Sequence, residues 1–174
     1  MTLAGQDKVL MLFRHAKAEQ VPGKADVERE LTARGRRDAQ AAGAWLREQG
    51  LGAELVLCSP SVRTRQTWDH AVTGGACGEA VSFPGLLYSG GVGGVLQAIR
   101  EEGDEAQVLM VVGHNPSMAA LASILSEGDG SRDAHDALAA GFPTSTVAVL
   151  RYRGAWLDLA PATAALERCH ISRG

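Results

Sequence analysis

Two histidines and two arginines stand at the ends of short apolar segments of the chain. Arg14 and His15 directly follow one such segment, His114 follows a second through a glycine, and Arg63 lies just beyond a third. A guanidinium group can grip an oxyanion with two parallel N–H donors, and a neutral imidazole can attack phosphorus. These residue types therefore suit chemistry at a phosphoryl group, provided that the fold brings the separate segments together.

Four segments rich in valine and leucine have the character of strands: residues 9–13, 54–58, 107–112 and 146–152. The first three show no polar alternation, which is typical of strands covered on both faces. Ligands of an open parallel sheet bind outside the carboxyl ends of its strands, so the residues after these three segments are expected to share one edge. A fifth, antiparallel strand is expected over Trp156–Leu159, paired back through a tight turn at Arg153-Gly154.

Helical patterns alternate with these strands, as in an α/β domain. The expected helices begin after Thr32 and end at Gly50, run from Ser61 to Val72, run from Val92 to Glu102, and start at Asn115 as cap with Pro116 in the first turn. The glycine-dense residues 90–94 fit no dinucleotide or Walker pattern and are interpreted as a loop. Residues 127–141 are interpreted as a surface insertion with one short helix. A single domain over residues 1–174 is expected.

Composition narrows the class of protein. The chain has 174 residues, 45% hydrophobic and 21% charged, and a formal net charge of −3. This charge gives no reason to expect a nucleic acid or a membrane as partner. The chain begins without the charged lead and apolar stretch of a signal peptide, and no apolar segment has the roughly 20 residues of a membrane helix, so a cytoplasmic location is expected.

Each polar motif taken alone is also compatible with a strand end or helix cap of no catalytic significance. A thiol phosphatase loop requires five residues between its cysteine and arginine, but Arg63 follows Cys58 after only four, and Thr64 occupies the required position. Zinc is the other alternative for paired histidines. Arginines beside both histidines would repel a dication and no third ligand is evident, so no metal or other cofactor is expected.

The combination of motifs resembles the histidine phosphatase superfamily, also called phosphoglycerate mutase-like, and within it the small SixA-type phosphohistidine phosphatases. The resemblance covers about residues 9–159 and rests on Arg14-His15-Ala16, Arg29 before Leu31-Thr32, Ser59-Pro60-x-x-Arg63-x-x-Gln66-Thr67, Leu87-Tyr88, Gly113-His114 and Phe142-x-Thr144-Ser145. It implies a three-layer α/β/α sandwich with a mostly parallel central sheet. One departure is Glu30, where the family usually has proline.

The resemblance also implies roles for individual residues. His15 would be the nucleophile that forms a phosphohistidine intermediate, while Arg14, Arg63 and His114 would hold the phosphoryl oxygens. Arg29 would be an additional phosphate contact. Phosphoryl transfer depends on positioning and positive charge more than on covalent help, which agrees with this set of residues.

A general acid is missing from its usual place. Larger branches of the family supply a carboxylate in the segment that here reads 81–88 and contains none; Glu79 and Glu19 are the nearest candidates. An alkoxide leaving group benefits from a proton donor, whereas the imidazole of phosphohistidine departs more readily. We therefore expect the substrate to be phosphohistidine on a protein partner. The alternatives are a phosphatase of small phosphorylated metabolites and a phosphate-binding regulatory module without turnover.

Overall fold

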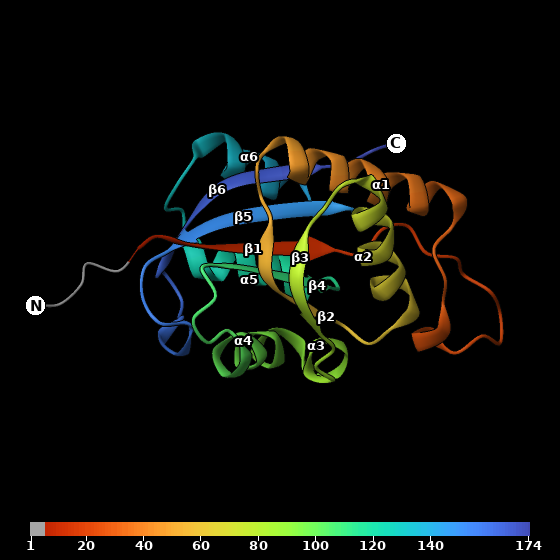
Figure 1. The fold of residues 1–174 in the computed structure, drawn as a ribbon, viewed down its shortest axis with the longest axis horizontal. Coiled ribbons are helices and arrows are strands. Elements are labelled where there is room, and N and C mark those ends of the chain that lie inside the picture. Colours follow the sequence, from red (N-terminus) through yellow and green to blue (C-terminus); the bar gives the residue numbers. More distant parts are fainter. Residues whose placement is uncertain (1–5) are drawn as a thin grey trace, which may run out of the picture.

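The computed structural model describes residues 6–174 and contains a six-stranded sheet in the order β3-β2-β4-β1-β5-β6 (Figure 1). The first four strands in this order are parallel to one another, and β5 and β6 are antiparallel to their neighbours. The bounds are Lys8–Arg14 for β1, Ala53–Cys58 for β2, Gly78–Ser82 for β3, Val108–Gly113 for β4, Thr146–Tyr152 for β5 and Ala164–Ile171 for β6.

Helices connect the strands. They are α1 Ala33–Glu48, α2 Val62–Gly74, α3 Leu86–Ser89, α4 Gly91–Glu102, α5 Ser117–Ser126 and α6 Arg132–Ala140, with 3₁₀ turns at Asp26–Glu28 and Trp156–Asp158. In Figure 1, α1 and α2 lie together, and α3 and α4 lie together in another part of the view. No helix among residues 6–174 is long and apolar enough to cross a membrane.

The central strand β1 separates two apolar cores. Leu10 and Leu12 belong to the core that α4 and α5 cover, whereas Met11 and Phe13 belong to the core that α1 and α2 cover. Alternate residues of a strand point to opposite faces of the sheet, so an unbroken apolar segment is what a strand between two helical layers requires. The predicted three-layer α/β/α sandwich with a mostly parallel sheet is confirmed.

The four strands predicted from valine- and leucine-rich segments are confirmed to within about one residue, but the fifth was placed wrongly. Trp156 and its two successors form a 3₁₀ turn, and the antiparallel partner of β5 is β6, further along the chain. Trp156 is buried and its indole N–H donates to the Ala106 carbonyl at 2.8 Å. This aromatic side chain anchors a connection to the core, which is why the segment has the apolar character of a strand.

The edge strand β3 was missed because it does not have a strand's pattern. Its residues Gly-Glu-Ala-Val-Ser are exposed or half-buried, and within residues 6–174 it pairs only with β2. An edge strand needs no continuous apolar face. Its pairing is decided by the neighbouring strand rather than by its own side chains.

The interpretation of residues 90–94 as a loop was also wrong, because α4 begins at Gly91. A Cβ atom on Gly90 would lie 2.7 Å from the Leu86 carbonyl oxygen, and one on Gly94 would lie 3.0 Å from the same atom. The glycines therefore permit α3 and α4 to pack closely rather than marking an open loop.

The remaining helix boundaries follow the sequence closely. Thr32 caps α1 by accepting a hydrogen bond from Gly35 N–H at 3.0 Å, and α2 follows Ser61 as its cap. The fourth expected helix, α5, begins one residue later than predicted, because Pro116 rather than Asn115 is its N-cap and Ser117 is its first residue. Asn115 still accepts a hydrogen bond from Ala119 N–H at 3.3 Å. The expected short helix within residues 127–141 is α6.

Candidate active site

The carboxyl ends of β1, β2 and β4 meet at one edge of the sheet, as the sequence predicted. His15 N–H donates to the Gly113 carbonyl at 3.0 Å, and Ser59 N–H donates to the Val112 carbonyl at 2.9 Å. These backbone bonds extend the sheet register by one residue on each side of β4. The first residues after three strands are thereby held side by side.

A cavity of about 290 Å³ opens at this edge. Its walls contain all five site residues proposed from the sequence. The lining residues are Arg14, His15, Lys17, Ala18, Gln20, Arg29, Arg63, His114, Asn115 and Thr144. The cavity is thus rich in cationic side chains and is suited to an anionic ligand.

His15 is held as a neutral imidazole with a defined tautomer. Its side chain is almost fully buried, and its Nδ1 atom lies 2.8 Å from the Ala16 carbonyl oxygen. A carbonyl can only accept, so Nδ1 carries the hydrogen and Nε2 keeps its lone pair. Burial lowers the pKa of His15 to about 3, against the opposing effect of the Ala16 hydrogen bond and with further lowering from His114, Arg63 and Arg14. Nε2 is therefore available as a nucleophile at neutral pH.

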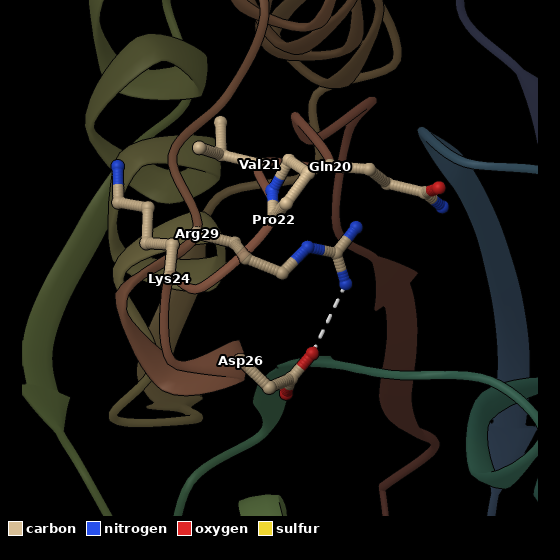
Figure 2. A pocket seen from close by; sticks show the side chains of 6 residues that line it. All are labelled: Gln20, Val21, Pro22, Lys24, Asp26 and Arg29. Atoms are coloured by element: carbon tan, nitrogen blue, oxygen red, sulfur yellow. Dashed lines mark hydrogen bonds and ion pairs between the residues drawn. The ribbon is translucent and has the colours of Figure 1, made fainter.

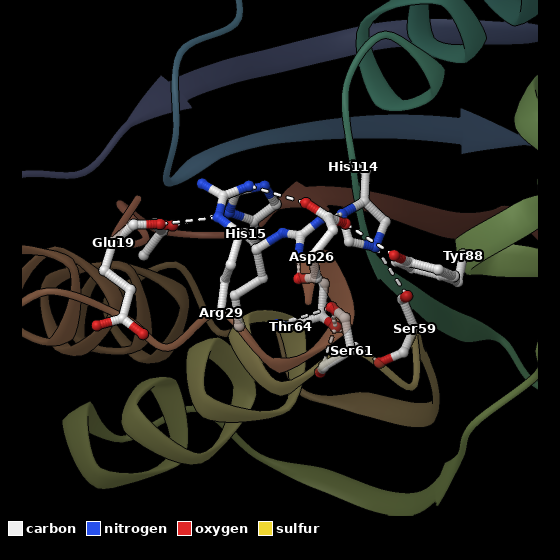
Figure 3. Close-up of polar contacts among 11 residues, drawn as sticks. His15, Glu19, Asp26, Arg29, Ser59, Ser61, Thr64, Tyr88 and His114 are labelled. Atoms are coloured by element: carbon white, nitrogen blue, oxygen red, sulfur yellow. Dashed lines mark hydrogen bonds and ion pairs between the residues drawn. The ribbon is translucent and has the colours of Figure 1, made fainter. Parts of the chain in front are cut away.

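His114 faces His15, with 5.3 Å between the ring centroids (Figure 3). Its Nδ1 atom lies 3.3 Å from Arg63 Nη2, and its Nε2 atom lies 2.8 Å from Ser59 Oγ. A guanidinium group can only donate, so Nδ1 accepts and Nε2–H donates to the serine hydroxyl. Burial, followed by the charge of Arg63, lowers the pKa of His114 to about 4. Both ring nitrogens are thus occupied within the protein before any ligand binds.

Arg14 and Arg63 each retain an unsatisfied donor. Arg14 Nη1 donates to the Phe142 carbonyl at 2.8 Å, and Arg63 Nη1 donates to the Asp26 carbonyl at 2.7 Å. The Nε–H groups of both arginines are buried without a partner among residues 6–174. Both guanidinium groups line the cavity and are fixed by these carbonyl hydrogen bonds, so they are preorganised to receive an anion.

Two polar side chains at the start of α2, Gln66 and Thr67, form hydrogen bonds to the backbone of the loop between β1 and α1. Gln66 Oε1 accepts a hydrogen bond from Leu31 N–H at 2.7 Å, and Thr67 Oγ1 accepts one from Ala16 N–H at 3.0 Å. The exposed Arg65, two residues after Arg63, lies outside the cavity with its guanidinium 4.2 Å from the Phe83 ring centroid. One arginine of the motif therefore enters the site, and the other lies at the surface.

Residues 142–145, which precede β5, form hydrogen bonds to residues at the ends of β1 and β4. The Phe142 carbonyl accepts from both Arg14 Nη1 and Asn115 Nδ2, at 2.8 and 2.9 Å. Ser145 N–H donates to the His15 carbonyl at 3.1 Å. Residues 142–145 thus fix the positions of the residues that end β1 and follow β4.

Arg29 reaches the cavity from the long loop between β1 and α1. Its Nε–H donates to the Glu19 carbonyl at 2.7 Å, and its Nη1 donates to Asp26 Oδ1 at 3.1 Å. Glu30, in the position where the family usually has proline, forms an ion pair with Lys24, and Arg29 lies at the cavity wall.

Asp26 is a site residue that sequence reasoning missed. Its Oδ2 atom accepts from Arg63 Nη2 at 3.0 Å and from the Tyr88 hydroxyl at 2.8 Å (Figure 3). These partners lie 37 and 62 residues away, so no local spacing indicates the contact. The only local signal is Arg29, three residues after Asp26, which pairs with the same carboxylate.

The two carboxylates proposed as weak candidates for a general acid are not in the cavity wall. Glu19 forms a hydrogen bond with Lys24, which is the main cause of the lowered pKa of Glu19, so its carboxyl group is ionised at neutral pH. Glu79 lies in the edge strand β3. Cys58 is fully buried in the core, and burial raises the pKa of its thiol to about 12. A thiolate nucleophile therefore has no support at this site.

Comparisons with known proteins agree with this geometry. Residues 10–79 match the model of the histidine phosphatase superfamily (branch 1). An uncharacterized protein of Mycobacterium tuberculosis is 40% identical over 162 residues, which cover 92% of this chain and all of that protein.

Solved structures of SixA proteins are similar over most of their length. The SixA protein from Nakamurella multipartitia, described as a candidate phosphohistidine phosphatase, is 35% identical with a TM-score of 0.83, covering 97% of this chain and 98% of that one. The SixA protein from Agrobacterium tumefaciens, described in the same way, is 31% identical with a TM-score of 0.70, covering 82% and 91%. These similarities support a phosphatase activity. The chain belongs to the histidine phosphatase superfamily and is of the SixA type within it.

Proposed function

We propose that the chain hydrolyses phosphohistidine on a protein partner through a covalent phosphohistidine intermediate on His15. The observation that carries the proposal is the state of His15: the ring is neutral, Nδ1–H is bound to a carbonyl, and the Nε2 lone pair is free. Such an imidazole needs no separate base to become a nucleophile.

The reaction takes two balanced steps. The His15 Nε2 lone pair forms a bond to phosphorus while the bond from phosphorus to the leaving group breaks, and that electron pair goes to the leaving atom. Water then attacks the phosphorus of the intermediate, and the N–P electron pair returns to His15. The products are the dephosphorylated substrate, inorganic phosphate and a neutral His15.

Arg14, Arg63 and Arg29 balance the charge of the phosphoryl oxygens. All three arginines line the cavity, so a phosphoryl group bound there is surrounded by three permanent positive charges. Removing one preorganised donor of this kind typically costs about 2.7–4 kcal/mol in activation free energy.

His114 becomes a hydrogen-bond donor to the phosphoryl group once that group has bound. A phosphoryl dianion favours the protonated imidazole, since an opposite charge raises a histidine pKa. Protonated Nδ1 then donates to a phosphoryl oxygen and releases Arg63 Nη2 for the same task. Binding of orthovanadate is therefore expected to take up a proton, measurable by calorimetry in two buffers of different ionisation enthalpy.

The preference for phosphohistidine follows from the missing acid. The cavity walls contain no carboxyl group among the described residues. Of the nearby carboxylates, Asp26 and Glu19 are both held ionised by their hydrogen-bond donors. A substrate that leaves as imidazole needs such a donor less than one that leaves as alkoxide. The candidate activity of the Nakamurella multipartitia SixA protein supports the same substrate class.

The test is an acid-labile phosphate on His15. Wild-type protein mixed with phosphohistidine and denatured in alkali is expected to carry phosphate on the peptide containing His15, and His15→Asn is expected to carry none and to lose turnover. His135→Asn is the matched control, because His135 lies on α6 away from the cavity. Near-normal turnover by His15→Asn would exclude the covalent mechanism. Faster turnover of alkyl phosphate esters than of phosphohistidine would instead favour a small-metabolite substrate, and phosphate binding without turnover of either would favour a regulatory module.

A further inference from the structure

A second cavity lies beside the catalytic cavity. The second cavity has a volume of about 440 Å³ and is lined by Gln20, Val21, Pro22, Lys24, Asp26 and Arg29 (Figure 2). Gln20 and Arg29 are walls of both cavities. The two cavities therefore adjoin along these two residues, and Asp26 lines the second cavity while its carboxylate binds Arg63 of the first.

The Asp26 carboxylate is an acceptor and not an acid. Three donors converge on it: Arg63 Nη2, the Tyr88 hydroxyl and Arg29 Nη1, at 3.0, 2.8 and 3.1 Å. The pKa of Asp26 lies far below its usual range. The main cause is the hydrogen bond from Tyr88, and the hydrogen bonds from Arg29 and Arg63 lower it further. An ionised carboxylate has about four acceptor positions, so one remains for a ligand. Its side chain is half exposed.

The chemistry of the leaving group defines what this acceptor can do. Phosphohistidine whose second ring nitrogen is protonated releases a neutral imidazole, whereas the unprotonated ring would have to leave as an anion. A nearby negative charge favours the protonated ring. The reactive form of this substrate therefore benefits from a fixed carboxylate beside the departing ring.

We propose that Asp26 is the leaving-group contact of this enzyme, accepting a hydrogen bond from the second ring N–H of the substrate's phosphohistidine and keeping that ring protonated. The proposal rests on the function proposed above. His15 Nε2 forms the new N–P bond, the substrate's N–P electron pair returns to its own ring nitrogen, and the ring departs as neutral imidazole with its other N–H still bound to Asp26. The ring is already protonated before it leaves, so the site needs no general acid to deliver a proton to it. An ionised carboxylate that keeps the ring protonated serves instead.

Other charged groups around Asp26 act on the same ring. Arg29 comes from the same loop, Arg63 from α2, and Lys24 from the wall of the second cavity. These cations oppose protonation of the ring. The Tyr88 hydroxyl is a neutral donor. His114, which the bound phosphoryl group protonates, lies 5.7 Å from the Tyr88 ring and also opposes protonation of the substrate ring. Removal of the Asp26 charge is therefore expected to lower the pKa of the substrate ring most directly.

The experiment measures kcat against pH for wild type and Asp26→Asn, with free phosphohistidine and with p-nitrophenyl phosphate, whose phenolate needs no proton. The alkaline limb for phosphohistidine, where its ring deprotonates, is expected to move about one pH unit lower in Asp26→Asn. At pH values above both limbs this lowers turnover of phosphohistidine about tenfold relative to the ester. The profile with the ester is not expected to move. Glu28→Gln is the matched control, because it removes an exposed carboxylate from the same 3₁₀ turn.

Two further measurements separate this role from simple support of Arg63. Inhibition by orthovanadate reports whether the arginines still bind an oxyanion, and Asp26→Glu is expected to restore part of the alkaline limb. Equal losses on both substrates with unmoved pH profiles and weakened vanadate inhibition would overturn the proposal and leave Asp26 as a positioning residue. If wild-type protein fails to turn over phosphohistidine, the proposed function fails; if wild type turns it over and Asp26→Asn leaves the limb in place, only this inference fails.

Discussion

Acidification from pH 7.5 to pH 5.0 is expected to destabilise the fold through the two site histidines. The pKa is about 3 for His15 and about 4 for His114, whereas a histidine in an unfolded chain has a pKa of about 6.5. At pH 5.0 the unfolded chain therefore binds a proton on each residue and the folded chain on neither. The stabilisation is complete above the unfolded pKa and is lost as the pH falls below it.

The magnitude follows from these values. About 1.5 pH units separate the unfolded pKa from pH 5.0, and one unit corresponds to about 1.36 kcal/mol, so each histidine removes about 2 kcal/mol and the pair removes about 4 kcal/mol. Asp26, whose pKa is also lowered, loses its contribution only at lower pH, below the unfolded value of about 3.9. Between pH 7.5 and pH 5.0 the free energy of unfolding therefore reports the site histidines without a contribution from Asp26. A loss of this size is a large fraction of the stability of an ordinary domain.

Urea unfolding at the two pH values measures the effect. His15→Asn keeps a side-chain N–H donor but cannot titrate, so it is expected to lose about 2 kcal/mol less than wild type between pH 7.5 and pH 5.0. His135→Asn, which removes a histidine outside the cavity, is expected to keep the full loss. If His15→Asn loses as much stability as wild type, the burial of a neutral imidazole at this position is refuted.

Three other predictions follow from single contacts. Ser59→Ala leaves the buried imidazole N–H after β4 without its acceptor and is expected to lower kcat about tenfold or more, measured by steady-state kinetics; unchanged kcat would contradict the role of this bond. Iodoacetamide at pH 8 is expected to label the exposed Cys77 and not the buried Cys58 in native protein, as mass spectrometry would show, and labelling of both would contradict the burial. Gly43→Ala is expected to destabilise the fold by at least about 1–3 kcal/mol in urea unfolding, because its Cβ would meet an α2 backbone carbonyl at 1.8 Å; a neutral effect would contradict this close helix packing.

Much of the fold could be predicted because its signals are local. The inner strands are apolar on both faces, since helices cover both faces of the sheet, and the caps Thr32 and Ser61 each bond to a backbone N–H three residues away. The edge strand β3 and the turn at Trp156 could not be predicted in the same way. Their conformations depend on pairing with β2 and on a hydrogen bond to Ala106, and neither partner is near in sequence.

The sequence by itself determined which residues stand at the strand ends. His15, His114 and Arg63 follow directly from the order of apolar segments and from the rule that parallel strands end at one edge. Only the tertiary structure decided the tautomer of each histidine, because tautomers depend on which donor or acceptor faces each ring nitrogen. It also decided the place of Asp26, whose carboxylate meets groups from α2 and α3 that no sequence spacing relates to it. Residue types are local properties of the chain, whereas charge state and hydrogen-bond direction are set by neighbours that only folding brings together.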